Sequence, residues 1–105
     1  MKVQINTDSN IEGHDELFQQ VEAVVRGALD RFSEQITRVE VHLSDENSDK
    51  KIGTNDKRCL LEARLAGLQP IAVSHQAATL EQAVDGAAEK LKRSLDSTLG
   101  RLGNR

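Results

Sequence analysis

The apolar residues of this chain repeat with two different periods, and the order of these periods limits the possible folds. Between residues 17 and 32 they recur every three or four positions, the spacing of one buried stripe on an α-helix. The same spacing returns between residues 80 and 102. Residues 3–5, 36–44, 57–65 and 71–75 instead alternate apolar and polar side chains, as strands with one solvated face do. The predicted order is strand, helix, three strands, helix.

Local signals mark the ends of these elements. Thr79 is followed three residues later by Gln82, a capping box that predicts the start of the last helix. Gly67 and Pro70 predict a tight turn between the last two strands. Residues 45–56 have no period and many charges, which is typical of a surface loop between strands.

Each predicted helix has one apolar stripe to bury, and each strand has one apolar face. An α+β fold of order β-α-β-β-β-α satisfies both needs when the two helices pack on one face of a four-stranded sheet. A chain of 105 residues is long enough for one such core and too short for two. We therefore predict a single domain over residues 1–105.

Composition and charge exclude several classes of function. The only aromatic residues are Phe18 and Phe32, too few for a platform on which single-stranded bases stack. The net charge of −3 argues against indiscriminate binding to nucleic acid. Residues 1–56 hold 12 acids and 6 bases, a balance of −6, whereas residues 57–105 hold 5 acids and 8 bases, a balance of +3. A local basic surface is therefore compatible with the acidic total.

The charges of the last helix separate by flank when its residues are placed 100° apart. One flank carries three cations: Lys90, Arg93 and Arg101. The other carries three acids and a lysine: Asp85, Glu89, Asp96 and Lys92. Pairs four residues apart, Glu89 with Arg93 and Lys92 with Asp96, are typical of an ordinary solvated helix face. The three cations on one flank also suit successive phosphates of a nucleic acid, and spacing alone leaves both interpretations open.

Two further sets of cations have a structural and a functional interpretation. Lys50, Lys51, Lys57 and Arg58 bracket the predicted loop, where they could contact phosphates or keep the loop soluble. On the open face of the sheet, arginines alternate with two glutamates, which predicts ion pairs across the strands. That set is Arg38, Arg58 and Arg64 with Glu40 and Glu62.

The sequence contains no recognisable catalytic or metal-binding motif. Three histidines and one cysteine, His14, His42, His75 and Cys59, are too far apart for the paired spacings of a zinc site. Cys59 is in phase with the core and is predicted to be a small buried apolar residue. A Cys–His pair that meets only in space stays open, but no feature favours it. We predict no enzyme activity, no metal, no cofactor and no small-molecule substrate.

The chain shows no signs of export or of membrane insertion. Its first ten residues lack the apolar run of a signal peptide, and no segment approaches the ~20 apolar residues of a membrane span. A single cysteine also suits a reducing compartment. We predict a cytoplasmic protein without a membrane partner.

His75, in phase with the core, is predicted to be a hydrogen-bonded histidine near a strand end.

The stretch TLEQAVDGAAEKLKRSL, residues 79–95, resembles the last helix of the ribosome hibernation-promoting factor and ribosome-associated inhibitor family. These proteins are also described as sigma-54 modulation or S30EA-like proteins. The chain resembles the short members of the family. The residues that match the family pattern there are Leu80, Ala83, Val84, Asp85, Lys90, Leu91 and Arg93. The end of the first helix and the second strand also match, through Leu29, Arg31, Phe32 and the stretch VEVHL at residues 39–43.

This resemblance implies a double-stranded-RNA-binding-domain-like fold that docks on the small ribosomal subunit and restrains translation. The implied partner is ribosomal RNA, and the phosphate contacts would come from Lys90, Arg93 and Arg101, helped by Lys92 and Arg31. An alternative is a homodimeric protein-interaction module that has lost ribosome binding, joined weakly through the open sheet face. The acidic first half favours that alternative, as do Val25 and Ala28, which stand where the family usually has lysines.

Overall fold

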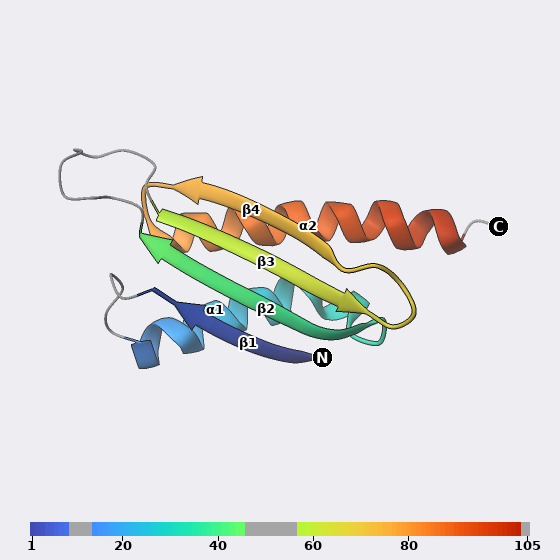
Figure 1. The fold of residues 1–105 in the computed structure, drawn as a ribbon, viewed down its shortest axis with the longest axis horizontal. Coiled ribbons are helices and arrows are strands. Elements are labelled where there is room, and N and C mark those ends of the chain that lie inside the picture. The colour runs from blue at the N-terminus through green and yellow to red at the C-terminus, as the bar shows by residue number, and fades with distance from the viewer. Residues whose placement is uncertain (9–13, 46–56, 104–105) are drawn as a thin grey trace.

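The computed structural model describes residues 1–8, 14–45 and 57–103. Figure 1 shows the elements, which are β1 (Lys2–Thr7), α1 (His14–Leu29), the short 3₁₀ helix η1 (Asp30–Phe32), β2 (Ile36–Asp45), β3 (Lys57–Leu65), β4 (Ile71–Ala77) and α2 (Leu80–Gly103). This order confirms the predicted β-α-β-β-β-α succession and the α+β class.

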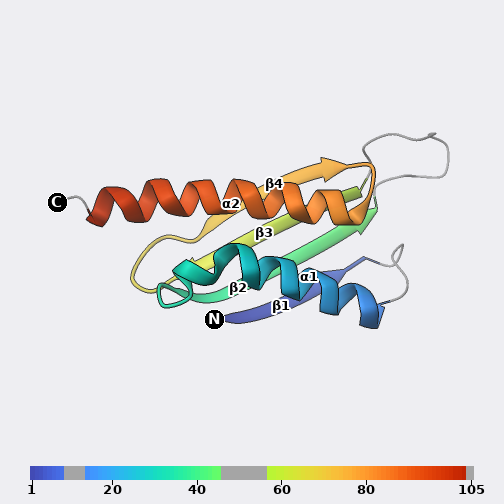
Figure 2. The ribbon, with the colours of Figure 1, turned by 180° about the vertical axis from the view of Figure 1, so that it is seen from behind.

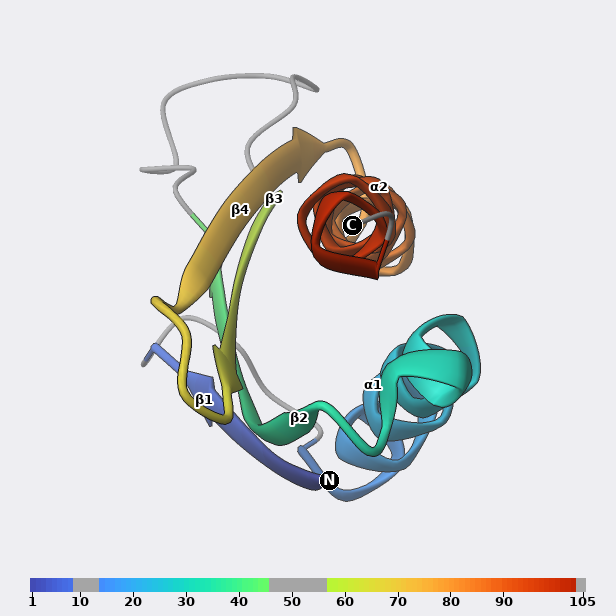
Figure 3. The ribbon, with the colours of Figure 1, turned by 90° about the vertical axis from the view of Figure 1, so that its right-hand side faces the viewer.

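The four strands form one sheet in the order β1-β2-β3-β4. β1 runs parallel to β2, and the other neighbours are antiparallel. A parallel pair needs a crossover between its strands, and α1 provides it. Both helices lie on the same side of the sheet, as the end-on view in Figure 3 shows. The other side is open, so the predicted two-layer arrangement is confirmed.

The core lies between the sheet and the two helices. Helix α1 contributes its predicted stripe through Val21, Val25 and Leu29, and η1 adds Phe32. The sheet contributes alternate residues of each central strand, and α2 contributes the apolar face that its spacing predicts. These buried residues are Ile36, Val39, Val41, Leu43, Cys59, Leu61, Ala63, Leu65, Ala77, Ala83, Val84, Ala87, Ala88, Leu91 and Leu95.

The predicted local signals are present at the ends of the elements. The backbone N–H of Gln82 donates to Thr79 Oγ1 at 3.1 Å, which caps the first turn of α2. Between β3 and β4, Gly67 has φ of 73°, a left-handed conformation that glycine adopts without steric cost. The turn needs that conformation, which explains the glycine at this position.

The two helices approach each other at one end and diverge at the other. They start at the same end of the sheet, and Figure 2 shows the gap between them widening towards their N-terminal ends. At the closed end, the guanidinium of Arg31 in η1 forms an ion pair with Asp96 of α2. This pair joins η1, which follows α1, to α2.

A cation from each helix reaches the backbone beside an outer strand of the sheet. On the β4 side, Lys90 Nζ donates to the carbonyl oxygen of Ser74 at 2.9 Å. On the β1 side, Arg26 Nη1 donates to the carbonyl oxygen of Met1 at 3.1 Å. The two contacts show which flank of each helix is turned towards the nearest sheet edge.

Candidate nucleic-acid interface

The first candidate cations lie on the flank of α2 that is turned towards β4. The contact of Lys90 with Ser74 fixes this flank, and the backbone carbonyl that it meets carries no formal charge. The positive charge of the Lys90 ammonium is therefore not cancelled by this hydrogen bond. Arg93 follows three residues later, so the two side chains stand one above the other on neighbouring turns.

Arg93 forms only a weak ion pair. Its Nε lies 3.7 Å from Glu89 Oε2, and the two side chains are 77% and 56% exposed. Exposed pairs spaced four residues apart contribute about 0.3–0.5 kcal/mol to stability because solvent screens them. Arg93 can therefore turn to an external phosphate at little cost in stability. The expected Glu89–Arg93 pair is present, but it does not hold the arginine tightly.

Arg31 and Lys92 do not join Lys90 and Arg93. Arg31 pairs with Asp96, and its guanidinium also stacks over the Phe32 ring, 4.8 Å from the ring centroid. The predicted Lys92–Asp96 pair is absent, because Asp96 faces Arg31. Lys92 is half-buried and forms no ion pair within residues 1–8, 14–45 and 57–103. Of the five predicted cations, Lys90 and Arg93 thus share one flank of α2, whereas Arg31 of η1 contacts α2 on its other flank, at Asp96.

Two groups of candidate cations fall wholly or partly outside what the structure describes. Arg101 belongs to the last turn of α2, where the structure describes the backbone but not the side chain. Lys50 and Lys51 lie outside the described residues. Their part in phosphate binding stays a prediction.

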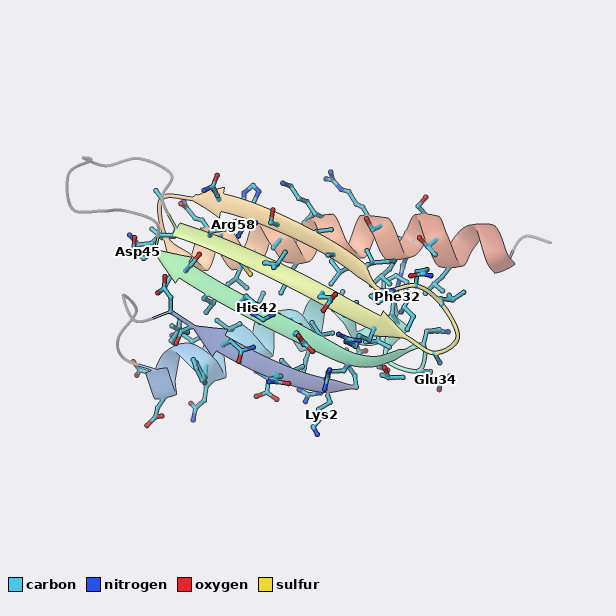
Figure 4. All side chains as sticks on the ribbon, viewed as in Figure 1. Lys2, Phe32, Glu34, His42, Asp45 and Arg58 are labelled. Atoms are coloured by element: carbon cyan, nitrogen blue, oxygen red, sulfur yellow. The ribbon has the colours of Figure 1, made fainter. Side chains whose placement is uncertain are left out.

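The other two cations of the predicted loop set, Lys57 and Arg58, point to opposite faces of the sheet. Lys57 is in phase with buried Cys59, and its Nζ lies 3.3 Å from Asp45 Oδ2. Arg58 alternates with it and lies on the open face, where Figure 4 shows it with Lys2 and His42. Because successive residues of a strand alternate between faces, these two cations cannot both contact a ligand on one face of the sheet.

The open face carries the ion pairs that alternation predicts. Glu40 is the centre: its Oε2 lies 2.7 Å from Arg38 Nη2 and 3.6 Å from Arg64 Nε. Arg64 Nη2 in turn lies 3.6 Å from Glu62 Oε1. The contact of Arg64 with Glu40 confirms the predicted pairing across the strands. The pairs of Arg38 with Glu40 and of Arg64 with Glu62 instead join residues of one strand. Arg58 differs, because it has no carboxylate partner in the described part of the chain.

The histidines and the cysteine do not come together as a catalytic or metal site. Within the described residues, no group of three or more His, Cys, Asp or Glu side chains could hold a metal ion. His75 faces the helices, as predicted, but its ring packs against Gly86 of α2 rather than making a hydrogen bond to a described group. Cys59 is fully buried.

Burial makes the Cys59 thiol unreactive. It raises the pKa of the thiol from 9.0 to about 12 by desolvating the thiolate. At pH 8 we expect a disulfide reagent such as Ellman's reagent to label the native protein at least ~1,000-fold more slowly than the urea-unfolded chain, because labelling requires opening of the core. Labelling of the native protein within the mixing time would contradict the buried position.

The raised pKa of Cys59 also predicts how stability depends on alkaline pH. Between pH 9.0 and about 12 the unfolded chain releases the thiol proton while the native protein keeps it. The free energy of unfolding should therefore fall as pH rises through this window. In urea denaturation at a series of pH values, the free energy of unfolding of Cys59→Ala should fall less with rising pH than that of the wild type. Identical slopes for the two proteins would contradict the assignment.

Comparison with known proteins identifies the family of this chain. Residues 3–102 match the family described as sigma 54 modulation protein / S30EA ribosomal protein. The chain belongs to this family. The match spans almost the whole sequence and confirms the resemblance found in the last helix, the first helix and the second strand.

Two solved structures share this fold. The N-terminal domain of Protein Y from Thermus thermophilus is similar with a TM-score of 0.72 and 23% identity, covering 93% of this chain and 99% of that one. A ribosomal subunit interface protein from Coxiella burnetii is similar with a TM-score of 0.70 and 16% identity, covering 95% of this chain and 99% of that one. The search of curated proteins found no match.

Two further findings concern the kind of function that this S30EA-family protein has. None of the helices that the structure describes is long and apolar enough to cross a membrane. The family description names a ribosomal protein rather than an enzyme.

Proposed function

We propose that this protein is a cytoplasmic, non-enzymatic factor that binds ribosomal RNA on the small ribosomal subunit and restrains translation. The observation that carries the proposal is the family match over residues 3–102. The solved relatives include one described as a ribosomal subunit interface protein, which is consistent with a ribosomal partner. Lys90 and Arg93 are the proposed centre of the contact, with Arg101 extending it along the same flank of α2.

The physical chemistry of the proposed contact suits structured RNA. Proteins read A-form helices through shape, phosphates and 2′-hydroxyls, without stacking bases on aromatic side chains. This chain has no Tyr and no Trp, and Phe32 is buried. Lys90 and Arg93 lie on neighbouring turns and their charges are not firmly neutralised. Each phosphate that they contact would add affinity through counterion release.

The competing homodimer through the open sheet face receives less support. Three of the charged residues on that face, Arg38, Glu40 and Arg64, already pair within one chain. Ions that are satisfied internally gain little from a second copy. Leu60 is the one half-buried apolar side chain among the open-face residues of β2 and β3. The homodimer stays a prediction.

The test is charge reversal on the proposed flank. Lys90→Glu with Arg93→Glu should abolish cosedimentation with small ribosomal subunits at low salt, because two phosphate contacts become repulsive. Binding to an RNA fragment for which both proteins keep measurable affinity should also be followed at several salt concentrations. The plot of log K against log salt should be less steep for the variant than for the wild type, by about 1.5 in slope. Addition of wild-type protein to a cell-free translation reaction should lower protein synthesis, and the variant should not.

A matched control separates the flank from overall charge. Lys2→Glu with Arg26→Glu changes the net charge equally, but it acts beside β1, at the opposite edge of the sheet. This variant should still pellet with the subunits, provided that circular dichroism shows it folded. If the Lys90/Arg93 variant pellets like the wild type, the β4-side flank of α2 is not the contact surface.

A further inference from the structure

The divergence of α1 and α2 leaves an apolar groove between their N-terminal halves. The groove has a volume of about 310 Å³. It is lined mainly by aliphatic side chains from both helices: Leu17, Val21, Val24, Leu80 and Val84, with Ala23, Gln20 and Glu81 at its sides. We name this feature the interhelix groove.

The floor of the interhelix groove is only partly covered by the protein itself. Val21 and Val84 are buried at the bottom, but Leu17, Val24 and Leu80 are half-buried. Partly exposed aliphatic side chains that converge from two helices gain free energy when another apolar group displaces the water above them, at about 25 cal/mol per Å². A large aliphatic or aromatic side chain is the kind of group that such a hollow admits.

The helix segments that form the groove carry acids and no Lys or Arg. These segments, residues 14–25 of α1 and 80–89 of α2, contain six acids: Asp15, Glu16, Glu22, Glu81, Asp85 and Glu89. Glu22 pairs with Arg26 and Glu89 pairs with Arg93, so the other four acids are those without an ion pair in the described part of the chain. The nearest cation of α1, Arg26, is turned away to the β1 side, where it pairs with Glu22 and donates to Met1. At the other end, Arg31 is held by Asp96. A polyanion such as RNA is therefore repelled from this groove.

We propose that the interhelix groove binds a segment of another protein that carries apolar side chains flanked by lysine or arginine. The apolar floor provides the contact area, and Glu81 and Asp85, one turn apart on the rim, select cationic neighbours. This charge complementarity gives specificity and speeds association. The site is separate from the proposed RNA contact, because Glu81 lines the groove whereas Lys90 lies beside β4. Asp85 follows Glu81 by four residues, so it lies on the same side of α2 one turn further along.

The experiment uses the full chain, labelled with ¹⁵N, and three unlabelled synthetic peptides. Each peptide has 15 residues, and its leucines, or the residues that replace them, recur every three or four positions. The first combines Leu with Lys, the second replaces every Leu by Ala, and the third replaces every Lys by Glu. We expect the Leu/Lys peptide to bind at least tenfold more tightly than the Ala/Lys peptide, and the Leu/Glu peptide not to bind. Amide shifts should concentrate in residues 17–24 and 80–85. Equal binding of the first two peptides, or shifts centred elsewhere, would overturn the proposal.

Charge-reversal variants test the rim. Glu81→Lys with Asp85→Lys should weaken binding of the Leu/Lys peptide at least tenfold. Asp30→Lys with Glu34→Lys changes the net charge equally at exposed positions around η1 and should leave the affinity within twofold. Equal losses in the two variants would mean that the peptide responds to overall charge, which would overturn the proposal.

The same reagents separate this inference from the proposed ribosomal function. Glu81→Lys with Asp85→Lys should keep cosedimentation with small subunits, and Lys90→Glu with Arg93→Glu should keep peptide binding. An RNA duplex added to the labelled protein should not shift the amides of residues 17–24. If the duplex shifts them as the Leu/Lys peptide does, the groove is part of an RNA surface and the protein partner is wrong.

Discussion

Replacement of Leu91 by alanine should lower the free energy of unfolding by about 2–5 kcal/mol, the range for a leucine truncated in a packed core. Leu91 is 0% exposed and lies in the middle of α2, facing the sheet. Its truncation removes apolar contacts and leaves a cavity that the surrounding side chains cannot fill completely. Urea denaturation followed by circular dichroism measures the loss.

Leu99→Ala is the matched control for this substitution. Leu99 lies two turns further along the same helix and packs only partly against the core. The same atoms are deleted in the same secondary structure, so helix propensity changes equally in the two variants. We expect Leu99→Ala to lose less than half as much stability as Leu91→Ala. Equal losses would show that the two positions do not differ in burial as described.

Gly86→Ala should destabilise the protein by about 1–3 kcal/mol, the usual cost of overpacking. Alanine normally stabilises a helix interior by up to ~1 kcal/mol relative to glycine. At this position, however, a β-carbon would overlap the ring of His75, which packs against the Gly86 backbone. The whole imidazole must rotate away, so the steric cost exceeds the gain in propensity. Thermal or urea denaturation reports the net effect.

Two other glycines and one double variant make this prediction specific. A β-carbon at Gly27 or Gly100 would meet no atom within 4 Å. Gly27→Ala and Gly100→Ala should therefore raise stability by about 0.4–1 kcal/mol. His75→Ala should remove most of the penalty of Gly86→Ala in a double-mutant cycle. If Gly86→Ala is as stabilising as Gly27→Ala, the close packing of His75 on α2 is wrong.

The fold could be predicted from the sequence because its signals are local. The apolar spacing of residues 17–32 and 80–102 and the alternation around Val39 and Leu61 depend on one element at a time. The Thr79 cap and the turn at Gly67 likewise depend on a few neighbouring residues. Once each element has one apolar face, a two-layer packing follows with little freedom. The family resemblance rests on the same patterns, so the sequence alone carries it.

The candidate site was only partly predictable, because it depends on which elements become neighbours. A helical projection places Asp96 correctly on the flank opposite Lys90, but it cannot show that Arg31 replaces Lys92 as the partner of Asp96. It also cannot show that Lys90 reaches a carbonyl of β4. Such contacts join residues from distant parts of the chain, and their geometry is set by tertiary packing rather than by spacing.

The interhelix groove was missed for a similar reason. Leu17, Val24 and Leu80 all fit the apolar stripes of their helices, so the pattern predicts burial for each of them. They remain half-buried because the helices diverge at this end. One signal was present in the sequence: residues 14–25 and 80–89 hold acids and no Lys or Arg. That signal becomes meaningful only when the two segments are known to lie side by side.

The reach of Lys90 to the Ser74 carbonyl bears on how the free protein avoids self-association. An outer strand with unsatisfied backbone groups is a template on which other chains can add strands, and a lysine at the edge discourages such growth. If Lys90 turns to a phosphate in the proposed ribosomal complex, it uncovers this edge of β4. On that proposal, the ribosome would cover the edge in the complex, and Lys90 would cover it in the free protein.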